Sequence, residues 1–347
     1  MSRDKLIIFG AVLLGLMGIL VYKQAKRDEA IGHAAATEMD LPSLGVPSDL
    51  DKLSIKNGDK PEVVVELVAD SNAAAPGPDA GPAMAWRLTA PLHADANQQS
   101  IKDLAANIGE LKIASHIQLR LDDETRKDKQ LDPAHAVHVV AWKGGEKKFD
   151  ALFGKSGAAG ELMVLADKPN DVWAVKGYSS YLYPKEPKDF RNKEIFHFED
   201  DKVFQVALTN SHGTFSFNKG GDGKWAATLG NKPIERLDPE KVKDMLRAYK
   251  MISADDFGDG KSQAETGLDK PEAHVVIHLT GDSATPEMFV GKTATGTNRY
   301  ASVAGNETIY VITSYAADWL TSDVSKYQSP ADAGAGDSGL KATAKKK

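Results

Sequence analysis

The chain has 347 residues, a formal net charge of −6, 41% hydrophobic and 27% charged residues, and no cysteine. This composition is that of a globular protein long enough for two cores of ordinary size. The acidic balance argues against a nucleic-acid partner, which needs a basic stripe. The lack of cysteine excludes disulfides, thiol nucleophiles and lipidated cysteines.

An uncharged apolar run, Leu6 to Tyr22, lies near the start of the chain. As a helix it would be about 25 Å long, and the flanking lysines can extend its reach across the ~30 Å hydrocarbon core. A cleaved signal peptide is the alternative, but charged residues follow at once and the nearest small-residue site, Ala34 to Ala36, is distant. A buried core helix fits less well because the run is apolar on every face. We therefore expect residues 1–27 to be a transmembrane anchor; the flanking charges nearly balance and do not set its orientation.

Two segments lack sustained periodicity. Residues 28–50 are rich in Ala, Pro, Gly and Ser, which predicts a stalk between the membrane and the body. Residues 329–347 predict a disordered tail, and its three final lysines are interpreted as a solvated end.

The body repeats itself at one spacing of about 137 residues. Leu131-Asp132-Pro133 recurs as Leu268-Asp269-Lys270-Pro271, Phe153-Gly154-Lys155-Ser156 as Val290-Gly291-Lys292-Thr293, Val172 to Val175 as Ile309 to Ile312, and Tyr178 as Tyr315. Equal spacing across separate blocks indicates a duplicated module, residues 51–198 and 199–328. We expect the copies to superpose with Leu131 on Leu268, Gly154 on Gly291 and Trp173 on Tyr310.

The sequence of each half indicates a group of strands, then one helix, then four more strands. Alternating and β-branched runs separated by turn residues predict strands at 53–56, 63–68, 86–88, 136–142, 148–153, 162–166 and 172–175, and at 203–209, 213–217, 225–227, 274–279, 286–290, 299–303 and 308–312. Residues 71–85 predict a surface loop, and each half ends in a short segment, 178–183 or 315–320. The predicted fold is α+β: two tandem copies of an antiparallel, meander-like sheet module with one main helix each.

The two helices have different start signals. Asp95 is the candidate N-cap of a helix at 95–112, and Asp238 followed by Pro239 is a stronger start for one at 238–252. Both carry apolar stripes at helical spacing, which are typical of core packing on a sheet and not of a cofactor site.

Several motifs suggest chemistry but lack its context. Gly154-Lys155-Ser156 and Gly291-Lys292-Thr293 resemble the end of a P-loop, but the required earlier glycine is Phe149 or Pro286 and no helix follows, so a hairpin turn is the preferred interpretation. Acidic clusters lack EF-hand spacing, and no G-x-S-x-G sequence is present.

Four histidines occupy matched regions: His135 and His138, and His274 and His278. Strand residues four apart lie about 13 Å from each other, too far to share one metal, so we expect ordinary strand histidines. Trp86 and Trp225 also match, and burial as equivalent core anchors is favoured over a partner contact.

These motifs together resemble the bacterial family called domain of unknown function 4340 (DUF4340). The resemblance rests on Trp86, Leu88 and Pro91, on Gly267-Leu268-Asp269-Lys270-Pro271, and on the Gly-Lys element and the strand Ile309 to Ile312. The first copy has Gln130 where the motif has glycine. The resemblance implies a single-pass inner-membrane protein with a cytoplasmic N-terminus and a periplasmic body, often associated with ABC-transporter components of the gliding-motility type. It transfers no catalytic residue.

We therefore expect a non-enzymatic, membrane-anchored extracytoplasmic interaction or scaffold module. Its expected partners are the lipid bilayer, through residues 6–22, and an ABC-transporter or envelope protein; no cofactor and no catalytic, metal or cofactor-binding residue is assigned. The alternative is an extracytoplasmic protein that binds a small molecule or glycan in the cleft between the repeats. A hydrolase with a dispersed site is a third hypothesis.

Overall fold

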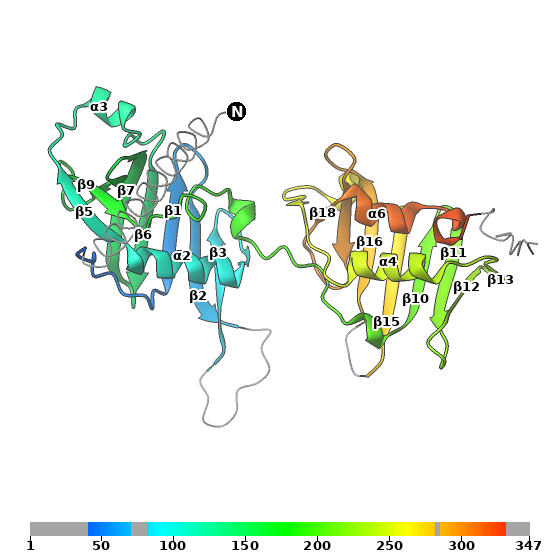
Figure 1. The fold of residues 1–347 in the computed structure, drawn as a ribbon. Helices are drawn as coiled ribbons and strands as arrows, with labels where there is room; N and C mark the ends of the chain where they lie inside the picture. The colour runs from blue at the N-terminus through cyan, green and yellow to red at the C-terminus, as the bar shows by residue number, and fades with distance from the viewer. Residues whose placement is uncertain (1–40, 71–81, 282–284, 331–347) are drawn as a thin grey trace, which may run out of the picture. The chain divides into compact units, whose positions relative to one another are not determined.

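The computed structural model describes residues 41–70, 82–281 and 285–330 (Figure 1). It divides into two compact units between Asn192 and Lys193, a few residues before the predicted boundary at 198/199. In these residues no helix has the length and apolarity needed to cross a bilayer. The predicted anchor at Leu6 to Tyr22 and most of the predicted tail lie outside the described residues.

The first unit contains a nine-stranded, fully antiparallel sheet in the order β4-β3-β2-β1-β6-β7-β8-β9-β5. Its strands are β1 (Lys52–Asn57), β2 (Val63–Ala69), β3 (Met84–Ala90), β4 (Ala94–Asp95), β5 (Lys112–Ile117), β6 (Val137–Lys143), β7 (Glu146–Gly157), β8 (Gly160–Leu165) and β9 (Val172–Lys176).

The second unit repeats this order as β13-β12-β11-β10-β15-β16-β17-β18-β14. Its strands are β10 (Val203–Asn210), β11 (Gly213–Lys219), β12 (Trp225–Leu229), β13 (Lys232–Pro233), β14 (Asp256–Phe257), β15 (Ala273–Leu279), β16 (Glu287–Thr293), β17 (Arg299–Val303) and β18 (Tyr310–Ile312).

The predicted repeat is therefore seen in the structure as two sheets of matching strand order. Gly154 and Gly291 lie in β7 and β16, and Trp173 and Tyr310 lie in β9 and β18. Leu131 donates its N–H to Arg126 O and Leu268 donates its own to Gln263 O, both at 2.8 Å. The strand order of the first sheet is not a simple meander. β1 lies between β2 and β6, although β6 is distant from it in the chain, and β5 pairs with β9 at the far edge of the sheet.

One long helix follows the first four strands of each module, as predicted. α2 (Gln98–Glu110) has Asn97 as its N-cap, whose side chain accepts from Ser100 N at 3.0 Å. The prediction of Asp95 was wrong: this residue lies in β4 and its carboxylate contacts Arg87. α4 (Pro239–Tyr249) begins after Asp238, as predicted, and Asp238 accepts from Glu240 N at 3.0 Å.

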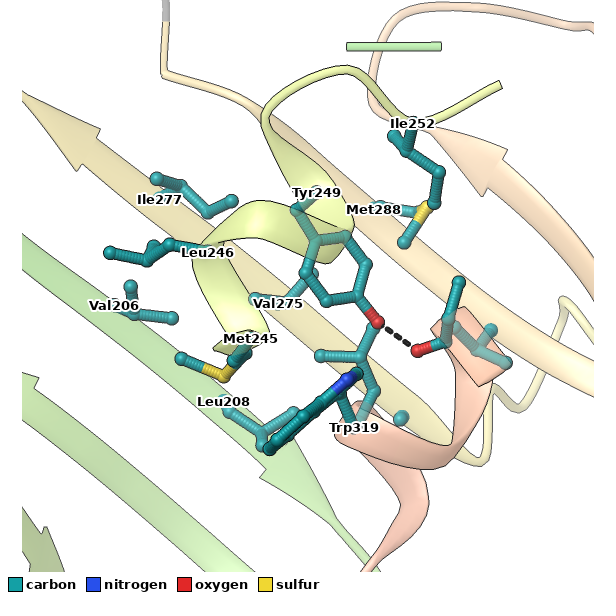
Figure 2. Packing of buried hydrophobic residues seen from close by; sticks show 14 of the residues in the cluster. Val206, Leu208, Met245, Leu246, Tyr249, Ile252, Val275, Ile277, Met288 and Trp319 are labelled. Carbon is teal, nitrogen blue, oxygen red and sulfur yellow. Dashed lines mark hydrogen bonds between the residues drawn. The ribbon is translucent and has the colours of Figure 1, made fainter. Parts of the chain in front are cut away.

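The second module has a second helix on the same face of its sheet. The prediction of one main helix therefore describes the first module better than the second. α6 (Ser314–Thr321) packs on β10 and β15 beside α4 (Figure 1). Figure 2 shows the Tyr249 hydroxyl of α4 donating to the Ala316 carbonyl of α6, above a layer of apolar side chains from β10 and β15. Tyr315 of α6 is 62% exposed, whereas its repeat partner Tyr178 stacks on Tyr183 at 4.5 Å between ring centroids.

Several short elements were not predicted. They are the edge strands β4, β5, β13 and β14, the helices α3 (Asp123–Asp128) and α5 (Gln263–Thr266), and the 3-10 turns η1 (Pro187–Phe190), η2 (Asp200–Lys202) and η3 (Val324–Tyr327). Residues 41–50 were expected in the stalk, but they run along the first module: Pro42 accepts from Ile113 N at 2.9 Å, and Leu50 is buried.

Candidate functional site

Each sheet has one face in the main core of its module and an opposite face that is only partly covered. In the first module, Leu131, Val164 and Val172 form a small buried cluster on that opposite face. Leu53, Ile55, Val139 and Ala141 point to the α2 side of the first sheet and are fully buried. The residues between them point the other way because successive strand residues alternate. We call the face opposite α2 or α4 the outer face of that module; being broad and only partly buried, it is the first candidate for contacts outside the chain.

The outer face of the first module carries ionised side chains in one cross-strand row. The register places Arg87, Glu66, Lys52 and Trp142 side by side on β3, β2, β1 and β6. Lys52 Nζ lies 2.8 Å from Glu66 Oε1 and 5.5 Å from the centre of the Trp142 ring. This face would suit a partner with charges of its own.

A histidine–carboxylate pair recurs at the same place on both outer faces. His138 Nε2 lies 2.8 Å from Asp150 Oδ1, and His274 Nε2 lies 2.7 Å from Glu287 Oε1. The registers make the pairs equivalent, because Val140 faces Asp150 as Val276 faces Glu287.

The surroundings of the two pairs differ. In the first module, burial alone would raise the pKa of the Asp150 carboxyl, but hydrogen bonds from Lys147 and His138 hold that pKa below its ordinary value. In the second module, His274 stacks on Phe289 with ring centroids 4.5 Å apart. Both pairs join neighbouring strands, which makes them cross-strand contacts as much as candidate acid–base groups.

The other two histidines do not join these pairs. His135 precedes β6 and lies 2.8 Å from Asp132, and the His278 ring lies 5.9 Å from that of Phe204. Within the described ranges, no three His, Cys, Asp or Glu side chains are grouped as a metal site would require. The carboxylate partners of His138 and His274 were missed in the sequence because they come from neighbouring strands, and only the register brings them into contact.

The two Gly-Lys motifs are not hairpin turns, so that interpretation was wrong. Gly154 and Gly291 lie inside β7 and β16, where a Cβ atom would come within 2.4 Å of Lys129 O and 2.3 Å of Thr266 O. Glycine is needed because the segment containing α3 or α5 crosses the strand at this point. The glycine of each motif therefore serves the packing of the α3 or α5 segment against the strand.

Trp86 and Trp225 occupy equivalent buried positions, as predicted. Trp86 is 4% exposed and Trp225 9% exposed. Each belongs to the hydrophobic core of its own module. They are anchors of the two cores and not surface contacts.

A pocket also recurs in each module, between the segment that enters the first strand and the open end of a hairpin. In the first module it has a volume of about 490 Å³ and is bounded by Leu44 and Val46, by the start of β7 and by the end of β8. In the second it has a volume of about 530 Å³ and is bounded by residues 195–199, the start of β16 and the end of β17. A matching backbone bond marks the equivalence: Ala166 N donates to Asp150 O at 3.0 Å, and Ala304 N to Glu287 O at 3.1 Å.

Comparison with known proteins identifies one family. The family model described as "Domain of unknown function (DUF4340)" matches residues 86–271, which is more than half of the chain and extends from β3 into the second module. No curated protein and no solved structure matches the chain.

Proposed function

The chain belongs to the DUF4340 family, and we propose that it is a non-enzymatic interaction module anchored in the bacterial inner membrane. Its body would lie in the periplasm and serve as a scaffold for an ABC transporter or another envelope complex. The anchor would be the apolar run at residues 6–22.

The observation that carries the proposal is the pair of outer faces. Each module buries one face of a nine-stranded sheet and leaves many half-buried or exposed side chains on the other, although the first module covers part of its outer face with a small apolar cluster around Val164 and Val172. Two broad faces in tandem suit the binding of large partners better than the turnover of a small substrate. On the first face the partner would be a protein. The charges of this row already pair within the chain, but their pattern can orient a partner of complementary charge.

A crosslinking experiment in native membranes tests this proposal. A photo-reactive amino acid replaces Lys56 on the outer face of the first module, and a matched control replaces Lys102, an exposed residue of α2. We expect adducts with a transporter subunit or envelope protein from position 56 and none from position 102. Equal labelling at both positions, or no protein adduct at either, would contradict the scaffold role.

The anchor and its orientation need separate measurements. Intact mass of the mature protein should show that residues 1–27 are retained; a start near Thr37 would mean cleavage. Protease added to intact spheroplasts should digest the body. Full protection would show that the body lies in the cytoplasm, opposite to the proposed topology.

The repeated pockets favour a second candidate function, the binding of a small molecule within each module. Volumes near 500 Å³ are in the range of ligand pockets. Ala166→Phe and Ala304→Phe would fill the two pockets from exposed positions, and Ala134→Phe is a control in an exposed loop. A metabolite that raises the melting temperature of the native protein and of the control, but not of the filled variants, would support this function.

A further inference from the structure

The outer face of the second module has lost the charges that its counterpart carries. The row Arg87, Glu66, Lys52 and Trp142 in the first sheet corresponds, by register, to Ala226, Asn218, Gln205 and His278 in the second. Three ionised side chains are thus replaced by one methyl group and two amides.

The replacement keeps the cross-strand contact while removing the charge. Lys52 and Glu66 form an ion pair at 2.8 Å. At the same place, Gln205 Nε2 donates to Asn218 Oδ1 at 2.9 Å, and Asn218 Nδ2 donates to Ser216 Oγ at 3.0 Å. The positions are equivalent and only the chemistry of the pair differs.

A second row shows the same change. Thr214, Thr209, His274, Phe289 and Ser302 lie side by side on five neighbouring strands. The position of Thr209 corresponds to Lys56 in the first sheet, since Thr209 faces His274 as Lys56 faces His138. The Oγ1 atoms of Thr209 and Thr214 lie 3.3 Å apart.

The third row completes an almost uncharged surface. It contains Thr228, Ser216, Ala207, Val276 and Glu287. Among the side chains of these three described rows, Glu287 is the one carboxylate and there is no lysine or arginine; Glu287 is paired with His274. Every residue of the three rows is exposed or half-buried.

This chemistry fits a neutral glycan, and we propose that the outer face of the second module binds one. Amides and hydroxyls each donate and accept hydrogen bonds, as sugar hydroxyls do, whereas an ammonium group only donates and a carboxylate only accepts. An uncharged ligand also avoids the cost of desolvating ionised side chains. Phe204, which is 43% exposed beside His278, and Phe289 add apolar ring surface for the C–H groups of a sugar.

The shape of the face favours a linear oligosaccharide. Rows that cross five strands are about 20 Å long at ~4.8 Å per strand, and they lie on a continuous sheet. An anionic polymer would find no lysine or arginine in these rows, and so electrostatic complementarity also points to a neutral ligand. This inference does not depend on the protein partner or membrane anchor proposed above.

Exchange of the two charge patterns provides the test. Gln205→Lys with Asn218→Glu installs on the second face the ion pair that the first face holds at equivalent positions. The matched control, Lys52→Gln with Glu66→Asn, installs the amide pair on the first face. Each pair is found at these positions in one of the two modules, and circular dichroism melts check that each variant is folded.

The measurement is binding of linear neutral hexasaccharides of glucose and of N-acetylglucosamine to the detergent-solubilised full chain, by calorimetry and affinity chromatography. We expect the native chain and the control to bind a neutral hexasaccharide, the Gln205→Lys/Asn218→Glu variant to bind at least tenfold more weakly, and hexagalacturonate to bind none of them. Lack of binding of every neutral probe at low millimolar concentration, or equal binding by the exchanged variant, would overturn the proposal. Self-association of the native chain that the exchanged variant loses in ultracentrifugation would instead assign the face to a second copy of the chain.

Discussion

Two glycines at matched positions keep space for a backbone carbonyl in each module. A Cβ on Gly154 would meet Lys129 O at 2.4 Å, and one on Gly291 would meet Thr266 O at 2.3 Å. Backbone atoms cannot swing aside as the end of a flexible side chain can. The segments that contain α3 and α5 therefore lie where they do because residues 154 and 291 lack a side chain.

Replacing either glycine should weaken its module. We expect Gly154→Ala and Gly291→Ala each to lower the free energy of unfolding by about 1–3 kcal/mol, the usual cost of forcing an extra carbon into a packed site. Gly221→Ala is the control, since nothing lies within 4 Å of its Cβ position. Urea denaturation of the three variants checks this; equal stabilities would show that the α3 and α5 segments move away freely.

A second matched pair differs in residue type but not in backbone. Gln130 has φ 54° and Gly267, its counterpart before the repeated leucine, has φ 73°. A left-handed conformation costs a non-glycine residue roughly 1–2 kcal/mol. We expect Gln130→Gly to raise the stability of the first module by up to about 1 kcal/mol, and Gly267→Gln to destabilise the second. Thermal melts that show both changes with the opposite sign would contradict this explanation.

Among the elements, the two long helices show how a cap selects the start of a helix. The side chain of Asn97 accepts a hydrogen bond from the Ser100 N–H, whereas Asp95 lies in β4 and does not cap the helix. We expect Asn97→Ala to cost about 1 kcal/mol. Asp95→Ala should cost less, because it removes an ion pair that is partly exposed to solvent. Denaturant unfolding of the two variants checks this, and the midpoint of Asn97→Ala should be the lower one. A lower midpoint for Asp95→Ala would mean that Asp95 is the cap.

Alternation predicted most of the strands but not the way they are joined. Phe215 and Phe217 are both fully buried, as their spacing predicted. β5 was missed because it follows α2 at once and five of its six residues are half-buried, without alternation. Glycine commonly marks turns, which is why the Gly-Lys motifs predict hairpin turns. The contact that requires glycine here comes from a segment distant in sequence, and local patterns do not reveal it.

The candidate binding face was beyond sequence analysis for a related reason. The amide pair Gln205 and Asn218 was not singled out, since both types are common at turns and surfaces. Its significance depends on the register that sets it opposite the position of Lys52 and Glu66. The duplication could be predicted from the equal spacing of its motifs. That charged residues in one copy are replaced by amides in the other became visible only from the register of the paired strands.

At the scale of the whole molecule, the chain contains separate cores. The large cluster around Phe217 and Trp225 is drawn from the second unit, and the one around Leu53 and Trp86 from the first. Damage to one core should therefore leave the other folded.

Tryptophan substitutions can test this independence. We expect Trp86→Ala and Trp225→Ala each to cost about 3–5 kcal/mol in its own module. Calorimetry should resolve two transitions, of which each variant lowers one. A single transition that falls equally in both variants would mean that the modules unfold as one cooperative body.

The position of β1 in the strand order has a consequence for synthesis of the chain on the ribosome. β1 pairs with β6, and the register joins Lys52 to Trp142. At about 5–20 residues per second, several seconds separate the emergence of these partners. Throughout that interval a nascent half-sheet of β1 to β4 presents an unpaired apolar strand edge, which is a template for wrong pairing. The second module meets the same delay between β10 and β15. Newly made chains should therefore need a holding chaperone twice, and a chain stalled just before residue 137 should aggregate more readily than one released after β9.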